Sequence, residues 1–219
     1  MRRIRVLIAD DHAMVLEAFR KLLEPSYDVV GTVTDGQALV RAAEALTPDL
    51  ILVDIGMPQL NGLDAIERVR ARRPGARLIV LTMNQDPDTA AEAIRRGAAG
   101  YVLKTSGSSE LFEAVAEVLR GKTYVSPTIA GGPSGVFAAE AVRQKDSGLT
   151  LRQREVLQLL AEGRSMKEAA RILDVTPRTI AFHKYSIMEQ LRVRNTAQLV
   201  QHAVSLGLVR PSRPRPVDE

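Results

Sequence analysis

The sequence predicts a doubly wound α/β domain with a parallel sheet of five strands, followed by a smaller all-α domain of four helices. Short apolar runs alternate with helix-like segments over the first 120 residues, a charge-free stretch rich in glycine and proline follows, and the rest carries helical signals. Strands that alternate with helices form parallel sheets. A chain of 219 residues has room for two such domains.

Five short apolar runs mark the strands of the first domain. Such runs are typical of strands that are buried on both faces of a parallel sheet. They cover residues 4–9, 29–30, 50–53, 78–81 and 101–103. Helical spacing fills the intervals, near residues 12–24, 36–46, 62–72, 87–97 and 108–121.

The character of the chain changes from Ser126 onward, where turn-forming residues replace charged ones. Three proline residues among the last nine residues predict a disordered tail. We therefore divide the chain into an α/β domain (1–122), a linker (123–147) with a short helix near 136–145, a helical domain (148–210) and the tail (211–219).

Capping residues mark where the helices of the second domain begin. Thr150, Ser165 and Asn195 each stand three residues before a Glu or Gln, which is the spacing of a capping box. Thr176-Pro177 places proline at a first helical position, and Gly163 ends the first of the four helices.

Composition excludes several classes of protein. The chain has no cysteine, which rules out disulfides, thiolate metal sites and a cysteine nucleophile, and fits a reducing compartment. The absence of tryptophan and an aromatic content of 4% argue against a base-stacking platform for single-stranded nucleic acid. The basic start lacks the apolar run of a signal peptide, and no segment approaches the roughly 20 apolar residues that span a bilayer. We expect a cytoplasmic protein with no membrane partner.

Charge is distributed unevenly along the chain. Residues 1–122 hold 16 Lys and Arg against 17 Asp and Glu, whereas residues 123–219 hold 14 against 9. The second part therefore carries a net charge of +5, and the first part −1. The excess suggests a polyanionic partner for the helical domain, and a solvated basic face is an equally good explanation.

Polar residues follow four of the predicted strands, at positions where functional groups collect in doubly wound folds. These are Asp10, Asp11, Asp54, Thr82 and Lys104. In the flavodoxin-like strand order 2-1-3-4-5 their strands are neighbours, so the side chains converge. Grouped carboxylates repel unless a cation lies among them, and oxygen ligands favour Mg²⁺. Asp54 could then attack phosphorus as a nucleophile, with Lys104 and Thr82 placed to contact the phosphoryl oxygens.

Simpler explanations exist for single residues of this group. Each aspartate could merely cap the helix that follows it, although that explains the set poorly. His12 comes directly after the acidic pair and suggests a metal ligand, but its place at the start of a helix accounts for it better.

The first domain resembles the receiver domain of bacterial two-component response regulators over residues 3–121. The resemblance rests on Asp10-Asp11, Asp54 to Pro58 with Asn61-Gly62, Thr82, and Tyr101 before Lys104. It implies that Asp54 accepts a phosphoryl group from a histidine kinase. It also implies that Asp11, Asp54 and the Gly56 carbonyl bind Mg²⁺ with help from Asp10. Thr82 and the inward-turning Tyr101 would form the switch, and Thr105 replaces the family's frequent proline after the lysine.

Residues 165–190 have the spacing of a helix-turn-helix. On a helical wheel Ile180, Ile187 and Leu191 face the core. The opposite side carries Arg178, Ala181, Phe182, Tyr185, Glu189 and Arg192, with His183 and Lys184 on the two flanks.

The segment 149–209 resembles the DNA-binding output domain of NarL/FixJ-type regulators. The resemblance rests on Leu149-Thr150, Arg154 to Leu157, Leu160 to Gly163, Ala169-Ala170, Leu173, Thr179-Ile180, His183, Ile187-Met188, Leu191 and Asn195. It implies a regulator that binds double-stranded DNA, with a homodimer on phosphorylation. The family frequently has Lys where Ala181 and Tyr185 stand, and aromatic side chains could instead pack on thymine methyl groups. The expected DNA contacts are Arg178, Thr179, Ala181, Phe182, His183, Lys184, Tyr185 and Arg192.

The sequence predicts a phosphorylation-controlled transcription regulator. We expect no enzymatic activity beyond its own aspartyl phosphorylation and dephosphorylation. Two other functions stay open. Phosphatases that form an aspartyl phosphate usually have a second carboxylate two residues after the nucleophile, where this chain has Gly56. An adaptor that binds another protein through its C-terminal helices is favoured only by Ala181 and Tyr185, and Phe182 and Tyr185 would then cover a protein surface.

Overall fold

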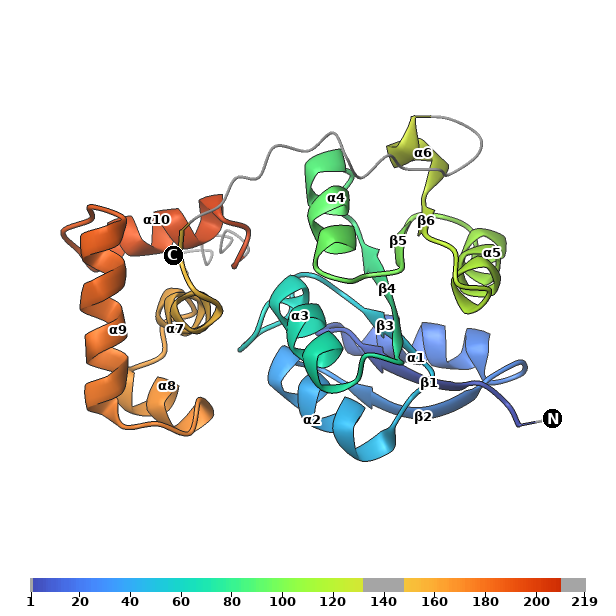
Figure 1. Cartoon of the computed structure of the whole chain (residues 1–219), viewed down its shortest axis with the longest axis horizontal. Coiled ribbons are helices and arrows are strands. Elements are labelled where there is room, and N and C mark those ends of the chain that lie inside the picture. The colour runs from blue at the N-terminus through green and yellow to red at the C-terminus, as the bar shows by residue number, and fades with distance from the viewer. Residues whose placement is uncertain (1, 132–147, 210–219) are drawn as a thin grey trace, which may run out of the picture. The chain divides into compact units, whose positions relative to one another are not determined.

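The computed structural model describes residues 2–131 and 148–209, which form two compact units, Met1–Lys145 and Asp146–Glu219 (Figure 1). The short helix expected near 136–145 and the tail at 211–219 lie outside the described residues. Among the described helices, none has both the length and the apolar character needed to cross a membrane. Each unit has its own hydrophobic core.

The first unit is a parallel sheet in the order β2-β1-β3-β4-β5-β6. The strands are β1 (Arg5–Ala9), β2 (Asp28–Val33), β3 (Leu50–Val53), β4 (Arg77–Thr82), β5 (Gly100–Leu103) and β6 (Tyr124–Val125). The parallel arrangement and the predicted order of the first five strands are confirmed. The chain order reverses between β1 and β3, which is where doubly wound folds place their functional site.

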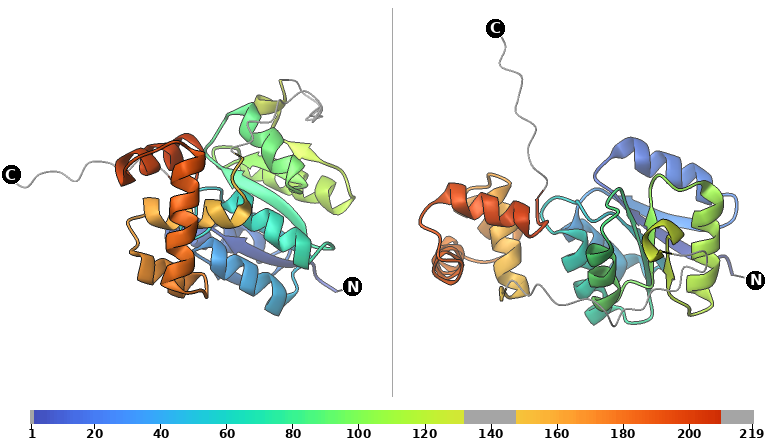
Figure 2. Two further views of the ribbon diagram at one scale, coloured as in Figure 1. Left: turned by 60° about the vertical axis from the view of Figure 1, so that its left-hand side comes forward. Right: turned by 90° about the horizontal axis from the view of Figure 1, so that it is seen from above.

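Helices cover both faces of this sheet, as Figure 2 shows from two sides. They are α1 (Ala13–Leu23), α2 (Gly36–Leu46), α3 (Gly62–Arg72), α4 (Pro87–Arg95), α5 (Ser108–Leu119) and the short α6 (Pro127–Ala130). Side chains of α1 and α5 pack on one face, and those of α2, α3 and α4 on the other. The strands are apolar throughout because alternate residues, such as Leu7 and Ile8, enter different cores.

The prediction of five strands was one short. Tyr124 and Val125 pair with Gly100 and Tyr101 and extend the sheet within the segment that we assigned to the linker. A two-residue strand carries no periodic signal, and the glycines and prolines that follow dominate the pattern there. Ile129 of α6 is also buried in the core of the first unit.

The described part of the second unit, residues 148–209, contains the four predicted helices, α7 (Leu151–Ala161), α8 (Met166–Ile172), α9 (Pro177–Gln190) and α10 (Thr196–Ser205). Capping boxes begin α7 and α8, and Thr176 and Asn195 cap α9 and α10 with their side-chain oxygens. Ile180 and Ile187 of α9 are fully buried, and Leu191 packs against the same core. The predicted inner side of α9 is therefore confirmed.

Candidate functional site

The ends of neighbouring strands bring Asp10, Asp54 and Lys104 together. Backbone hydrogen bonds continue the sheet past its last paired residues: the Asp54 amide donates to Ala9 (2.9 Å) and the Lys104 amide to Thr82 (2.8 Å). These bonds fix each side chain at the carboxyl edge of the sheet. The convergence of these three residues follows from strand order alone.

A buried lysine joins two carboxylates at the centre of this pocket. Lys104 Nζ lies 2.5 Å from Asp10 Oδ2 and 3.0 Å from Asp54 Oδ1. The lysine side chain is 9% exposed and that of Asp54 is 0% exposed. Two carboxylates can share this buried environment because the ammonium group lies between them.

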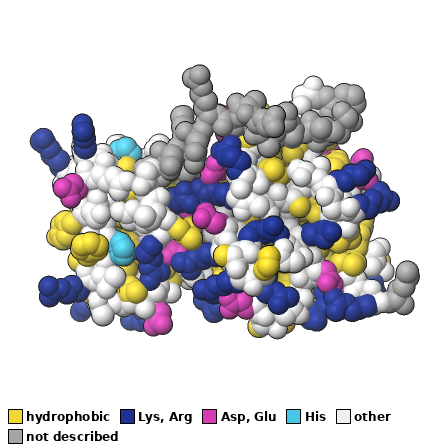
Figure 3. Space-filling view, in the orientation of Figure 1, with side chains coloured by type: hydrophobic (Ala, Val, Ile, Leu, Met, Phe, Trp, Pro, Cys, Tyr) yellow, Lys and Arg dark blue, Asp and Glu magenta, His cyan; other side chains and the backbone are white. Residues whose placement is uncertain are grey.

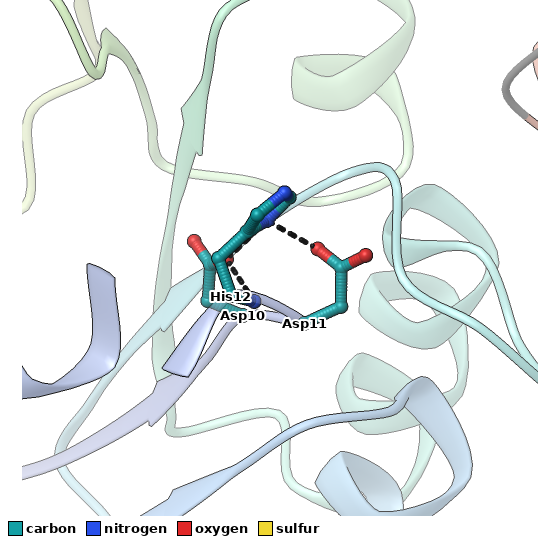
Figure 4. A group of neighbouring side chains, drawn as sticks. All are labelled: Asp10, Asp11 and His12. Carbon is teal, nitrogen blue, oxygen red and sulfur yellow. Dashed lines mark hydrogen bonds and ion pairs between the residues drawn. The ribbon is translucent and has the colours of Figure 1, made fainter. Parts of the chain in front are cut away.

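Asp11 and His12 form the outer rim of the same pocket (Figure 4). His12 Nδ1 lies 2.8 Å from Asp11 Oδ1 and 3.2 Å from Asp10 Oδ1, and the His12 amide donates to Asp10 Oδ1 at 2.9 Å. His12 is the N-cap residue of α1, as expected, but its side chain makes no capping hydrogen bond. The imidazole turns to the carboxylates instead.

The aspartates are not helix caps. The N-cap residues of α1 and α3 are His12 and Asn61, so neither Asp10, Asp11 nor Asp54 has the simple role that the sequence left open. Carboxylates of Asp10 and Asp11 with a ring nitrogen of His12 can present donor atoms within 4.8 Å of one another. Together with Asp54, this oxygen-rich set is suitable for a divalent cation.

The loop after β3 is held tightly against α3. The Gly56 amide donates to Asp54 Oδ2 at 3.2 Å, and the Gly62 amide donates to the Ile55 carbonyl at 2.8 Å. A Cβ atom at Gly62 would lie 2.1 Å from the Asp54 carbonyl oxygen, so only glycine permits this approach. Asn61-Gly62 therefore positions the phosphoacceptor candidate as well as opening a helix.

Asn84 links the two predicted switch residues, although no sequence pattern marked it as part of the site. Its amide donates to Thr82 Oγ1 at 3.1 Å, and its carbonyl accepts the Tyr101 hydroxyl at 2.9 Å. Its side chain accepts the Asp86 amide (2.8 Å) beside the start of α4. Tyr101 points inward and is fully buried, and this burial raises the pKa of its hydroxyl. The peptide between Lys104 and Thr105 is trans.

A second candidate surface lies on α9. Phe182 is 70% exposed and Tyr185 is 66% exposed, which is unusual for large aromatic side chains. The Phe182 ring meets the ring of His183 edge-on, with centroids 5.7 Å apart. Burial, together with the charge of Arg152, lowers the pKa of His183. Figure 3 shows hydrophobic side chains among Lys and Arg on the helical unit.

The other residues predicted to contact DNA occupy different environments. Arg178 is exposed, and Thr179, Ala181, His183 and Lys184 are partly buried. Thr179 Oγ1 lies 2.9 Å from Thr176 Oγ1 at the start of α9. Arg192 follows the end of the helix in a left-handed conformation with φ of 54°, so the helical wheel does not describe its direction.

Comparison with known proteins matches each unit to a family. Residues 6–116 match the family described as "Response regulator receiver domain", and residues 147–203 match "Bacterial regulatory proteins, luxR family". The chain belongs to the response regulators with a LuxR-type output domain. It combines a receiver with a DNA-binding domain, which is the architecture of phosphorylation-controlled transcription regulators. Below, the first unit is called the receiver and the second the output domain.

Curated relatives and solved structures align with most of the regulator. The transcriptional regulatory protein MctR of Rhizobium johnstonii is 36% identical and covers 94% of this chain and 96% of its own. The nitrate/nitrite response regulator NarL of Escherichia coli K12 is 30% identical, covering 88% and 91%. The structure of RcsB from Salmonella enterica serovar Typhimurium, bound to promoter P1flhDC with BeF₃⁻, has a TM-score of 0.59 at 30% identity and covers 93% and 100%.

Proposed function

We propose that a histidine kinase phosphorylates Asp54 of this regulator, and that the phosphorylated form binds double-stranded DNA through α9. The observation that carries the proposal is the contact of Lys104 Nζ with both Asp54 and Asp10 inside the pocket. A cation at this position would balance the negative charge of an incoming phosphoryl group, which supports the proposal. Because its target is genomic DNA, the regulator acts in the cytoplasm.

The chemistry is a phosphoryl transfer to a carboxylate. An Asp54 oxygen attacks the phosphorus of phosphohistidine, the new O–P bond forms as the P–N bond breaks, and the histidine leaves with the electron pair. Lys104 balances charge on the phosphoryl oxygens, and the Thr82 hydroxyl donates a hydrogen bond to one of them. The same pocket, rather than a separate enzyme, supports phosphorylation by small donors and hydrolysis of the product.

Mg²⁺ fits the donor set of this pocket, since its oxygens come from carboxylates and a backbone carbonyl. Asp11, Asp54 and the Gly56 carbonyl would hold it, with Asp10 assisting. When bound, the ion supplies charge neutralisation among the carboxylates and on the donor phosphate. Lys104 would add its own charge to that of the ion in balancing the phosphoryl oxygens.

Thr82, Asn84 and Tyr101 connect phosphorylation of Asp54 to the surface of α4 and β5. A Thr82 hydroxyl that turns to the phosphoryl group weakens its bond to the Asn84 amide, and the same residue holds Tyr101 and the start of α4. The surface of α4 and β5 therefore responds to phosphorylation.

On DNA, the exposed side of α9 enters the major groove. Arg178 and Lys184 contact phosphates, and Phe182 and Tyr185 face base edges, with Thr179, Ala181, His183 and Arg192 as further contacts. Val200 and Val204 lie one turn apart on α10 and are only partly buried, which supports an apolar contact between two copies. A dimer recognises two half-sites about one helical turn apart.

The two alternatives are weaker. A phosphatase needs an acid/base carboxylate where Gly56 stands, and Gly56 instead donates a hydrogen bond from its backbone amide to Asp54. An adaptor role explains the exposed Phe182 and Tyr185 but gives no purpose to the lysine and carboxylates of the receiver.

Small-donor phosphorylation tests the receiver site. Acetyl phosphate with Mg²⁺ should add the mass of one phosphoryl group to the protein, and EDTA should prevent it. Asp54→Ala should remove the reaction, whereas the exposed Asp28→Ala should leave it unchanged. A phosphorylated Asp54→Ala protein would show that the acceptor lies elsewhere.

A second experiment joins phosphorylation to output. Sedimentation and mobility shift on genomic fragments, at one salt concentration, should show more dimer and tighter specific binding after treatment with acetyl phosphate. Equal dimer content and equal affinity with and without the donor would mean that the output domain acts independently of Asp54. Failure to bind any fragment would favour the adaptor.

A further inference from the structure

His12 occupies an unusual place for a residue that begins a helix. Its ring makes no capping bond, its side chain is 53% exposed at the mouth of the pocket, and Nδ1 faces one oxygen each of Asp10 and Asp11. Figure 4 shows the ring turned toward both carboxylates. Asp10 Oδ2 contacts Lys104, and Asp10 Oδ1 is the oxygen that faces His12.

The distance from His12 Nδ1 to each carboxylate fits ligation of one ion. Two donor atoms that each lie about 2.1 Å from a metal, at a right angle, are about 3.0 Å apart. The distances from His12 Nδ1 are 2.8 Å to Asp11 and 3.2 Å to Asp10, on either side of that value. A small movement of the ring would therefore exchange a hydrogen bond for a coordinate bond.

Imidazole changes the kind of ion that the pocket prefers. Carboxylate, carbonyl and water oxygens suit Mg²⁺, whereas imidazole nitrogen suits Ni²⁺, Cu²⁺ and Zn²⁺, which also bind nitrogen and oxygen sites more tightly in general. Asp10 and Asp11 are shared between the two kinds of ligand set. A bound transition ion would consequently occupy carboxylates that Mg²⁺ needs.

We propose that His12 Nδ1, with the carboxylates of Asp10 and Asp11, forms a site for a divalent transition-metal ion that competes with Mg²⁺ in this receiver. The proposal rests on the divalent-cation site of the proposed function and adds a ligand and a selectivity to it. Its consequence is a receiver whose phosphorylation is blocked by Ni²⁺ or Zn²⁺ at concentrations far below that of Mg²⁺.

Calorimetric titration of the full-length protein with Mg²⁺ and with Ni²⁺ tests the ligand. Loss of a group that only supports a ligand costs about 10- to 100-fold in metal affinity, and loss of a ligand costs at least as much. His12→Ala should therefore weaken Ni²⁺ binding at least tenfold and leave Mg²⁺ affinity within twofold. His12→Asn keeps a hydrogen-bond donor near the carboxylates, and it should fail to restore Ni²⁺ binding.

The other two histidines of the chain, His183 and His202, provide the control. A His183→Ala/His202→Ala variant should keep the Ni²⁺ site. Pulsed EPR of the Cu²⁺-loaded protein should show coupling to an imidazole nitrogen that His12→Ala removes and the control variant retains.

The outcomes separate the two levels of the proposal. If Mg²⁺ and Ni²⁺ affinities fall together in His12→Ala, or if His12→Asn restores both, His12 only orients the carboxylates and the proposal is wrong. Absence of the nitrogen coupling in the wild-type protein also overturns it. If instead the wild-type protein binds Ni²⁺ through His12 but no Mg²⁺, the magnesium site of the proposed function fails while the His12 ligand stands.

Discussion

The receiver pocket buries charged side chains, whereas the exposed side of α9 presents aromatic side chains to solvent. In the pocket, charged and polar side chains are buried and contact one another, as Lys104 does with Asp10 and Asp54. On α9, Phe182 and Tyr185 project large apolar rings into solvent. Burial of charge and exposure of aromatic surface both cost free energy. Each arrangement is therefore typical of a site that binds a ligand.

The two sites depend on the sequence in different ways. The pocket is assembled by four strands whose order fixes which residues meet, so its chemistry follows from the fold. The α9 surface consists of one helix face that its own unit does not constrain. What this surface can bind therefore depends on individual side chains, which can change without disturbing the core.

Removal of the buried cation should have the largest effect. Lys104→Ala leaves Asp10 and Asp54 buried without their counter-charge, which we expect to cost about 3 kcal/mol in the free energy of unfolding of the receiver at pH 7. Denaturant unfolding measures it, and Mg²⁺ should restore part of the loss. Lys122→Ala is the matched control. Lys122 is 67% exposed and pairs with Glu117, so its removal should hardly change the free energy of unfolding. Equal effects of the two variants would contradict the assignment of a charge-balanced pocket.

The aromatic side chains of α9 should behave in the opposite way. Phe182→Ala and Tyr185→Ala should each reduce discrimination between specific and random DNA by about 1 to 3 kcal/mol, since each would lose the base contact proposed for it. Their unfolding free energies should stay within about 0.5 kcal/mol of the wild-type value, as for other surface substitutions. Competition mobility shift and denaturant unfolding measure the two quantities. Full discrimination combined with lower solubility would assign these rings to a protein surface.

The same comparison explains what the sequence could predict. Alternation of strands and helices predicted a parallel doubly wound sheet, and the flavodoxin-like strand order that we adopted for it was enough to bring Asp10, Asp54 and Lys104 together. Buried and exposed sides of α9 followed from its period, as Ile180 and Ile187 confirm.

Other features depend on geometry that no residue pattern encodes. Asn84 acts through its backbone amide and carbonyl as well as its side chain, and any residue carries those backbone groups. The helical wheel does not give the direction of the Arg192 side chain, because α9 ends at Gln190 and Arg192 has a left-handed backbone conformation. The ring of His12 could not be placed, because a helix start fixes the backbone and leaves the side chain free to turn.

A smaller effect should follow from removal of the Tyr101 hydroxyl. Tyr101→Phe loses the hydrogen bond to the Asn84 carbonyl, and we expect it to cost about 1 kcal/mol of unfolding free energy at pH 8. Burial raises the pKa of Tyr101, so above pH about 10 the folded protein keeps a proton that the unfolded chain loses. More protons bound in the folded state mean that stability falls as pH rises.

The wild-type protein should therefore lose stability relative to Tyr101→Phe as pH increases beyond about 10, when denaturant unfolding is repeated along a pH series. Tyr185→Phe serves as the control, because the Tyr185 side chain is 66% exposed to solvent. An unchanged gap between wild type and Tyr101→Phe across the series would mean that the Tyr101 hydroxyl is already exposed to solvent.

The smallest expected change concerns Lys184, which the proposal places on a phosphate rather than a base. Each phosphate contact contributes about 0.9 to the slope of log affinity against log salt concentration, independent of sequence. Lys184→Ala should therefore reduce the magnitude of this slope by about that amount and weaken specific and random DNA equally. Mobility shift at several salt concentrations measures both, with Lys167→Ala on α8 as a control outside the proposed contact. A changed preference among sequences would place Lys184 against a base edge, and the division between charged flanks and an aromatic centre on α9 would then fail.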